Sequence, residues 1–194
     1  GVNTLPFESK YKVYIIDEVH MLTKEAFNAL LKTLEEPPAH AVFILATTEI
    51  EKLPETVGSR CQTFTFKKPN QAMLREATLA TAKKEGFTLE PAAGDLIAIL
   101  GDGSFRDTHG IFQKVISASK DKKVSREEVE IVTGAPKNSI VNAFIDAIAE
   151  GKAEKGIAAL HAAAENNIDM VIFSKLVLEK LRFVLLIAHA PDMA

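Results

Sequence analysis

Two short apolar runs near the start of the chain have the pattern of buried strands. Residues 13–16 read V-Y-I-I and residues 41–46 read A-V-F-I-L-A. Runs of this length, rich in β-branched residues and without polar alternation, predict parallel strands buried on both faces of a sheet. Residues 24–36 between them repeat apolar positions at helical spacing, after a capping residue at Thr23 and before a proline pair that ends the helix. A strand–helix–strand unit of this order predicts right-handed parallel connectivity.

The pattern changes after residue 61. Residues 62–66 alternate threonine and phenylalanine and predict a half-exposed edge strand. The chain then passes a Lys-Lys-Pro-Asn linker and becomes helical. The predicted helices cover residues 71–85, 91–100, 105–118, 125–133, 136–150, 152–166 and 169–189. The fold class is therefore α/β plus all-α, with predicted domains at residues 1–68, 69–135 and 136–194.

Composition narrows the range of functions. The chain has 194 residues, 47% of them hydrophobic and 25% charged, as in ordinary globular proteins. Its net charge of −3 argues against a protein that binds DNA through an overall positive charge. The single cysteine, Cys61, allows no internal disulfide or cysteine-rich zinc site, and no apolar run reaches the length of a membrane span. These features predict a cytoplasmic protein.

Polar side chains follow both buried strands. Asp17 and Glu18 end the first, and Thr47 and Thr48 end the second. Ligands of parallel sheets bind at the carboxyl ends of strands, where one carboxylate can orient hydrated Mg²⁺ and another can polarise an attacking water. The alternatives are that the acids mark a solvated loop and that the threonines are β-branched strand ends of the usual kind.

Two arginines are further candidates. Arg60 precedes the predicted third strand, and the pattern of that strand does not account for an arginine at this position. It is either an ordinary surface arginine or one that is presented to a phosphate. Arg106 lies in the first turn of a helix capped by Ser104, where a cation opposes the helix dipole. The N-terminus of such a helix and the arginine can bind the same anion. Otherwise Arg106 would pair with Asp102 or Asp107.

The motifs Y-K-V-Y-I-I-D-E-V-H-M-L, I-L-A-T-T-E and K-L-P-E-T-V-G-S-R-C together resemble the AAA+ ATPase subunits of bacterial sliding-clamp loaders. The resemblance is dense over residues 11–68, weaker through G-D-G-S-F-R-D, and only in helix register beyond residue 136. It implies a truncated AAA+ parallel sheet, a helical lid domain and the start of a helical collar domain. The implied partners are the other loader subunits, the sliding clamp and primer–template DNA met through the assembled ring, with no membrane.

The resemblance also implies roles for single residues. Asp17 and Glu18 match the Walker B pair, with Asp17 near Mg²⁺ through water. Thr48 matches sensor 1. Arg60 matches an arginine finger that acts on ATP held by a neighbouring subunit, and Arg106 matches the sensor 2 arginine that touches the γ-phosphate from the lid.

The sequence departs from the family pattern in two respects. It contains no G-x-x-x-x-G-K-[ST] loop and no four-cysteine zinc module. The resemblance implies ATP and Mg²⁺ in the full-length protein. Without the loop, this chain alone should bind ATP weakly or not at all and should not hydrolyse it. In the family a further strand lies between residues 41–46 and 62–66. Without it, the apolar faces of Val13, Ile15, Phe43 and Leu45 should lose cover.

Three alternatives stay open. The D-E-V-H motif also fits the D-E-x-H box of a helicase, in which His20 would couple hydrolysis to strand movement. A non-catalytic loader subunit of the delta-prime type would donate only Arg60. Finally, the chain's sole activity by itself could be self-association through uncovered apolar surface.

Overall fold

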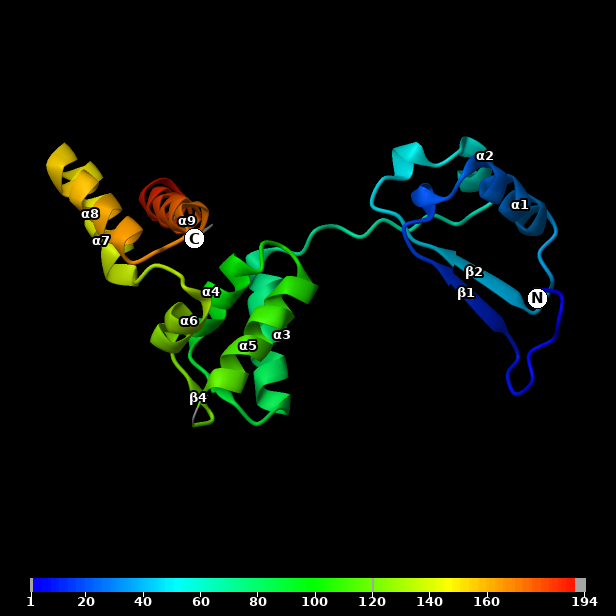
Figure 1. Ribbon diagram of the computed structural model, residues 1–194, viewed down its shortest axis with the longest axis horizontal. Helices are drawn as coiled ribbons and strands as arrows, with labels where there is room; N and C mark the ends of the chain where they lie inside the picture. The colour runs from blue at the N-terminus through cyan, green and yellow to red at the C-terminus, as the bar shows by residue number, and fades with distance from the viewer. Residues whose placement is uncertain (1, 120, 191–194) are drawn as a thin grey trace. The chain divides into compact units, whose positions relative to one another are not determined.

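In the computed structural model, residues 2–119 and 121–190 are described, and the chain divides into two compact units, Gly1–Phe66 and Lys67–Ala194. Unit 1 contains β1 (Lys12–Ile16), η1 (Val19–Met21), α1 (Lys24–Glu35), β2 (Ala41–Leu45), η2 (Ile50–Lys52) and α2 (Glu55–Gly58). The strands β1 and β2 are parallel and lie side by side (Figure 1). The predicted α/β element is thus present.

One face of the β1–β2 sheet is covered and the other is open. Phe27 of α1 packs with Val19 and Val57 against the covered face. The opposite face carries a row of exposed side chains: Val13 (54% exposed), Ile15 (71%), Val42 (39%) and Ile44 (47%). The predicted burial on both faces is therefore wrong among the described residues.

In β2 the side chains left exposed are those of Val42 and Ile44, whereas the prediction named Phe43 and Leu45. Val13 pairs with Val42 in register, so Val42 and Ile44 share its face. Because strand side chains alternate, Phe43 and Leu45 point to the covered face. The ring of Phe43 stacks on Tyr14 with ring centroids 5.2 Å apart.

The predicted strand at residues 62–66 does not form. This segment is extended but without strand hydrogen bonding, and Phe64 and Phe66 are 70% and 94% exposed. A strand needs a partner for its backbone N–H and C=O groups. Within residues 2–119 and 121–190, β1 pairs only with β2, and no ladder reaches residues 62–66.

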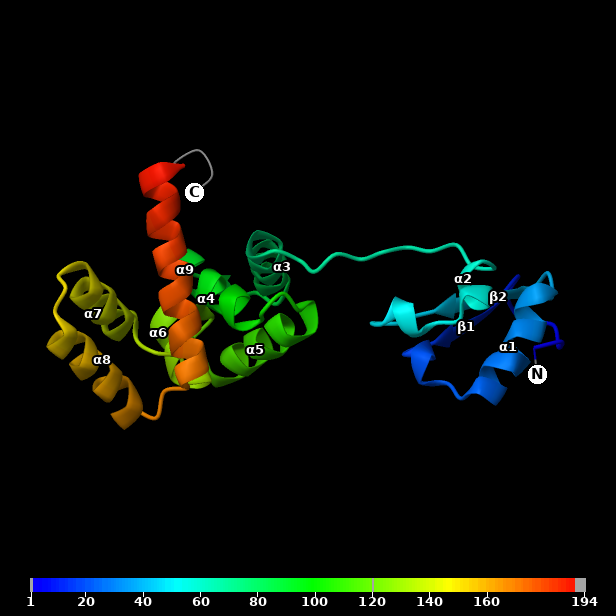
Figure 2. The same cartoon turned by 90° about the horizontal axis from the view of Figure 1, so that it is seen from above.

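Unit 2 is helical, as predicted (Figure 2). Its elements are α3 (Gln71–Lys84), β3 (Thr88–Leu89), α4 (Pro91–Leu100), α5 (Phe105–Ala118), β4 (Lys123–Val124), α6 (Arg126–Thr133), α7 (Asn138–Ala149), α8 (Ala153–Glu165) and α9 (Met170–His189). The parallel pairing of β3 with β4 was not predicted, because two residues are too few to show a pattern.

Local capping explains the helix starts. The side chains of Asn70, Ser104 and Asp169 accept backbone N–H groups of the first turns of α3, α5 and α9. Ser125 and Glu128 form the reciprocal capping box that the sequence predicted for α6. These caps satisfy backbone donors that a helix start leaves unpaired.

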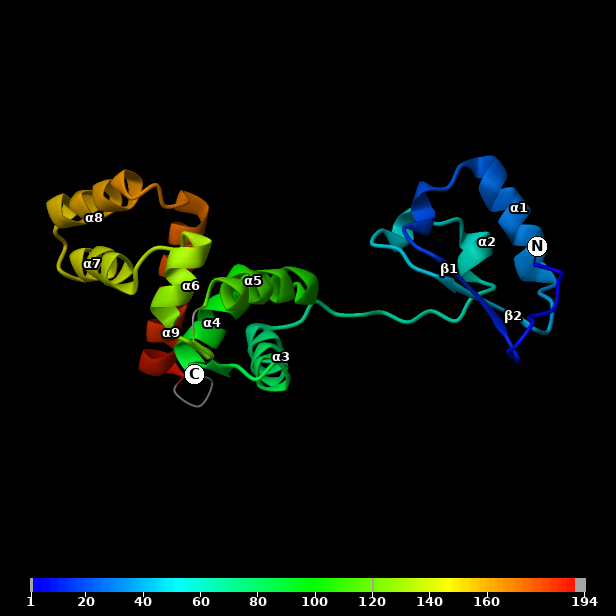
Figure 3. The same ribbon diagram turned by 60° about the horizontal axis from the view of Figure 1, so that its bottom comes forward.

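The core of unit 2 joins its helices across long sequence separations. Leu96, Ile97, Phe112 and Val115 from α4 and α5 pack in one buried cluster that also includes Phe173 of α9. Figure 3 shows α4 and α6 beside α9. Among the described helices, none is long and apolar enough to cross a membrane.

Candidate functional site

The polar ends of β1 and β2 meet at one edge of the sheet. Beyond the paired strands, the amide of Ala46 donates to the carbonyl of Ile16 (2.9 Å), and the amide of Val19 donates to the carbonyl of Ala46 (2.9 Å). These bonds continue the ladder past the strands and hold the two following turns together. The expected convergence of the two strand ends is present in the structure.

Asp17 and Glu18 occupy a tight turn after β1. The Glu18 backbone is left-handed, with φ 46° and ψ 47°, and its amide donates to Asp17 Oδ1 at 3.0 Å. A non-glycine residue in this region costs about 1–3 kcal/mol, so neighbouring contacts must hold it there. The next residue, Val19, is fully buried and its amide is bonded to the Ala46 carbonyl, which anchors the turn.

Thr48 contacts the second carboxylate directly. Its hydroxyl donates to Glu18 Oε2 at 3.2 Å, while the Glu18 side chain stays 47% exposed. Thr47, one position earlier, faces His20 instead. The structure therefore brings Glu18 and Thr48 together. The two threonines differ in their contacts, because Thr48 bonds to Glu18 and Thr47 to His20.

His20 is the site residue that sequence reasoning considered only for a helicase. Its side chain is 6% exposed. Nδ1 lies 2.8 Å from Thr47 Oγ1 and 3.3 Å from Glu18 Oε2, while Nε2 lies 3.1 Å from Glu49 Oε2. The signal available in the sequence was only its position two residues after Glu18.

The exposed carboxylate at this edge suits contact with a hydrated Mg²⁺. Across residues 2–119 and 121–190 there is no group of three or more His, Cys, Asp or Glu side chains that could hold a metal ion. Mg²⁺ usually keeps several waters and is held by one or two carboxylates together with substrate phosphates. The exposed Asp17 carboxylate at the strand end suits that kind of contact.

Arg60 lies away from the carboxylate edge. Its guanidinium donates to the Thr56 carbonyl and to Glu35 Oε1, each at 2.8 Å, and its side chain is 35% exposed. Glu35 ends α1, which returns from the carboxyl edge to the start of β2. Within unit 1, Arg60 is thus not brought to Asp17 or Glu18.

Arg106 is exposed in the first turn of α5, in unit 2. The expected alternative partner, Asp102, instead pairs with Lys175 of α9 at 2.8 Å. Hydrogen bonding and charge attraction from Lys175 lower the pKa of Asp102 below its ordinary value of 3.8. Asp107 uses its backbone amide to donate to the Ser104 cap.

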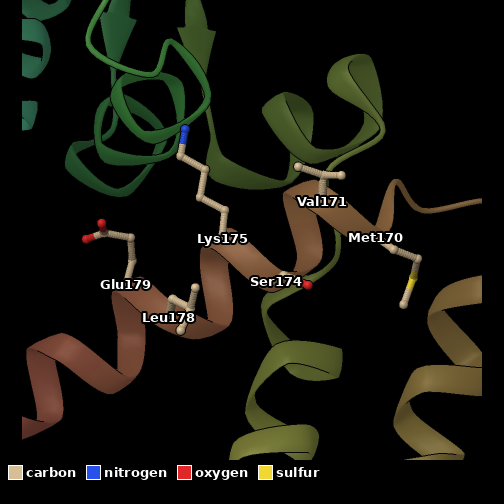
Figure 4. Close-up of a pocket in the computed structure, with 6 residues that line it drawn as sticks. All are labelled: Met170, Val171, Ser174, Lys175, Leu178 and Glu179. Carbon is tan, nitrogen blue, oxygen red and sulfur yellow. The ribbon is translucent and has the colours of Figure 1, made fainter.

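A shallow hollow on α9 contains none of the predicted site residues. It is mainly apolar, and its polar members are a serine, a lysine and a glutamate (Figure 4). Its lining residues are Met170, Val171, Ser174, Lys175, Leu178 and Glu179. The candidate site therefore stays at the β1–β2 edge.

Comparisons with known proteins show which proteins the chain resembles. Residues 1–70 match the family described as "DNA polymerase III, delta subunit". The chain is 38% identical over 169 residues to DNA polymerase III subunit tau of Salmonella typhimurium, a match that covers 87% of this chain and 26% of that protein. It is 46% identical to DNA polymerase III subunit tau of Bacillus subtilis over 134 residues. That match covers 69% of this chain and 24% of the Bacillus subtilis protein.

The chain is a homologue of the gamma/tau subunit of bacterial DNA polymerase III. A further gamma/tau relative, from Mycobacterium tuberculosis, is 32% identical over 189 residues, covering 97% of this chain and 33% of that protein. The chain thus spans about a quarter to a third of the length of these relatives. The relatives carry the names of DNA polymerase III subunits, which does not favour the helicase alternative.

Solved structures support the fold. Thermotoga maritima RuvB, titled a Holliday junction branch migration motor, matches with a TM-score of 0.57 and 19% identity. That match covers 70% of this chain and 50% of the RuvB chain. At this level of identity the likeness supports the predicted AAA+ type of fold and does not bear on the function.

Proposed function

We propose that this gamma/tau homologue serves in the ATP-driven clamp loader of bacterial DNA polymerase III. It would contribute part of a nucleotide site whose ATP hydrolysis drives the opening of the sliding clamp and its loading onto primed DNA. The observation that carries the proposal is the Glu18–Thr48 contact at the shared edge of β1 and β2. That edge is where parallel sheets bind ligands.

Each residue of the edge has a distinct task in this proposal. Asp17 would hold the hydration shell of Mg²⁺. ATP would supply the phosphoryl group, and the ion would neutralise charge on its phosphates. Glu18 would accept a proton from, or orient, the attacking water. Thr48 would place its hydroxyl beside that water or the γ-phosphate.

The two arginines would complete the site from elsewhere. The ion pair of Arg60 with Glu35 is partly exposed at 35% and 52%, so the guanidinium can exchange Glu35 for a phosphate of a neighbouring subunit. Such an arginine stabilises charge in the transition state of phosphoryl transfer. Arg106, exposed at the start of α5, is proposed to reach the γ-phosphate from the lid.

The partners follow from the same role. They are the other loader subunits in a hetero-oligomeric ring, the sliding clamp, and primer–template DNA held by the assembled ring. Contacts with DNA would be made to phosphates and would be independent of sequence. The proposed place of work is the cytoplasm.

The test is ATP turnover by the assembled loader carrying Glu18→Gln. Removing a general base should lower kcat by about 10²–10⁴-fold while nucleotide binding persists. Glu8→Gln makes the same chemical change at an exposed carboxylate that precedes β1, at the opposite end of that strand from Glu18, and should leave turnover unchanged. Equal rates for Glu18→Gln and the wild type would refute a hydrolytic role.

A second candidate function is a non-catalytic loader subunit. The match of residues 1–70 to the DNA polymerase III delta-subunit family favours it. In that case Arg60→Ala would lower turnover by the assembly, whereas Glu18→Gln would not. The same pair of variants thus separates the two candidates.

A further inference from the structure

His20 contacts the carboxylate to which we assign hydrolysis. Both of its ring nitrogens are engaged, Nδ1 with Thr47 and Glu18 and Nε2 with Glu49. A histidine at 6% exposure could simply be a satisfied core residue. Its contact with the exposed Glu18, rather than with other core groups, points to a role in that carboxylate's geometry.

The backbone around His20 is fixed from both sides. Val19 is fully buried, and its amide is bonded to the Ala46 carbonyl. The amide of Met21 donates to the Glu18 carbonyl at 2.8 Å, and the amide of Leu22 donates to the Val19 carbonyl at 3.1 Å. The imidazole is therefore presented by a closed turn, whereas the Glu18 side chain reaches into solvent on rotatable bonds.

Two side chains lie close to the same oxygen of Glu18. Thr48 Oγ1 is 3.2 Å and His20 Nδ1 is 3.3 Å from Oε2. On its other side the His20 ring is fixed by Glu49, which is itself bonded to Lys52 at 2.6 Å. The chain of contacts thus runs from Lys52 through Glu49 and His20 to Glu18.

We propose that His20 is a positioning residue that holds Glu18 Oε2, so that Oε1 faces the attacking water. The inference rests on the proposed function and deepens it, because it assigns a task to a residue that does not itself touch the nucleotide. Misplacing a catalytic group by about 1 Å can cost on the order of 100-fold in rate. Loss of the His20 contact should therefore lower kcat more than it changes KM.

The test compares three substitutions in the assembled loader. His20→Leu removes both ring nitrogens and should lower kcat on the order of 10- to 100-fold, with KM for ATP changed less than about twofold. His20→Asn keeps a donor near the Nδ1 position and should recover most of kcat. His20→Gln reaches toward the Nε2 position and Glu49 instead, and should recover little.

His40→Leu is the matched control. His40 is a second histidine of unit 1, whose Nε2 contacts the Val2 carbonyl at 3.0 Å, before β2 begins and away from the carboxylates. It should leave kcat unchanged. Because Asn and Gln are both polar and differ by one methylene, their comparison stays decisive even if the leucine variant fails to fold.

The outcomes separate this inference from the proposed function. Equal recovery by Asn and Gln, or wild-type kcat in His20→Leu, would overturn the positioning role if Glu18→Gln is inactive in the same assembly. Full activity of Glu18→Gln would instead overturn the proposed function. A low kcat with unchanged KM, rescued by Asn alone, would support both.

Discussion

At the scale of single residues, Asp102 shows a charge effect that can be measured. It lies in the turn before α5 with a left-handed backbone, φ 50°, and pairs with Lys175 of α9. The contact lowers its pKa, so the folded state binds a proton less readily than the unfolded state does. The stabilisation is therefore present above pH 3.8, the ordinary pKa, and is lost as pH falls through the lowered value.

We expect Asp102→Asn to lower the melting temperature at neutral pH and to match the wild type at pH values well below 3.8. Asparagine tolerates the left-handed conformation, so the change isolates the charge. Thermal unfolding of both proteins across the acid range is the measurement. In a Lys175→Gln background the pH-dependent difference should shrink to the smaller part that the charge of Lys68 causes, and an undiminished difference there would rule out the pair as its main cause.

Residue-scale chemistry was only partly predictable from the sequence. Asp17, Glu18 and Thr48 could be placed together because parallel strand ends share an edge. The contacts of His20 could not, because they depend on a left-handed turn at Glu18 that brings the ring beside Thr47. The roles of Arg60 and Arg106 stay predictions.

At the scale of elements, two glycines flanking the start of α5 should respond oppositely to the same substitution. A Cβ at Gly110, inside the helix, would meet nothing within 4 Å. Gly110→Ala should therefore stabilise the protein by up to about 1 kcal/mol through helix propensity. A Cβ at Gly101 would lie 1.9 Å from Thr108 Oγ1 and 2.9 Å from Thr108 Cα, so Gly101→Ala should destabilise by about 1–3 kcal/mol.

Urea unfolding followed by circular dichroism checks both glycine variants. Each serves as the control of the other, since both add one methyl group to unit 2. Stabilisation by both, or destabilisation by both, would contradict the packing around α5.

Helices were predictable as elements because their caps are local. The starts of α3, α5 and α6 follow from Asn70, Ser104 and Ser125, whose side chains bond within the same turn. The strand expected at residues 62–66 failed because a strand depends on a partner that local pattern does not contain. The face of β2 to which Phe43 and Leu45 belong was also predicted wrongly. It depends on the register between β1 and β2, which the local pattern does not contain either.

At the scale of the whole molecule, the two units should differ in stability. The fully packed centre of unit 1 is small, formed by Val19, Phe27 and Val57 beside a sheet with one open face. Unit 2 has a larger buried cluster, which includes Phe112. A small core leaves less apolar burial to offset chain entropy.

The sequence provides a separate probe for each unit. Its two tyrosines, Tyr11 and Tyr14, are both in unit 1 and it has no tryptophan, while most helix lies in unit 2. We expect tyrosine fluorescence to report melting at a lower temperature than helical circular dichroism. Val57→Ala should shift only the tyrosine transition, and Phe112→Ala, at a cost of about 3–5 kcal/mol, only the helical one. One coincident transition would contradict two independent units.

The proposed division of the catalytic site between subunits is tested most directly by mixing two inactive variants. Loaders would be assembled from Glu18→Gln chains, from Arg60→Ala chains, or from both together, and ATP turnover measured for each. A site shared across subunits predicts that the mixture regains activity, because some interfaces then combine an intact Glu18 with an intact neighbouring Arg60. Turnover in the mixture no higher than in either variant alone would contradict it.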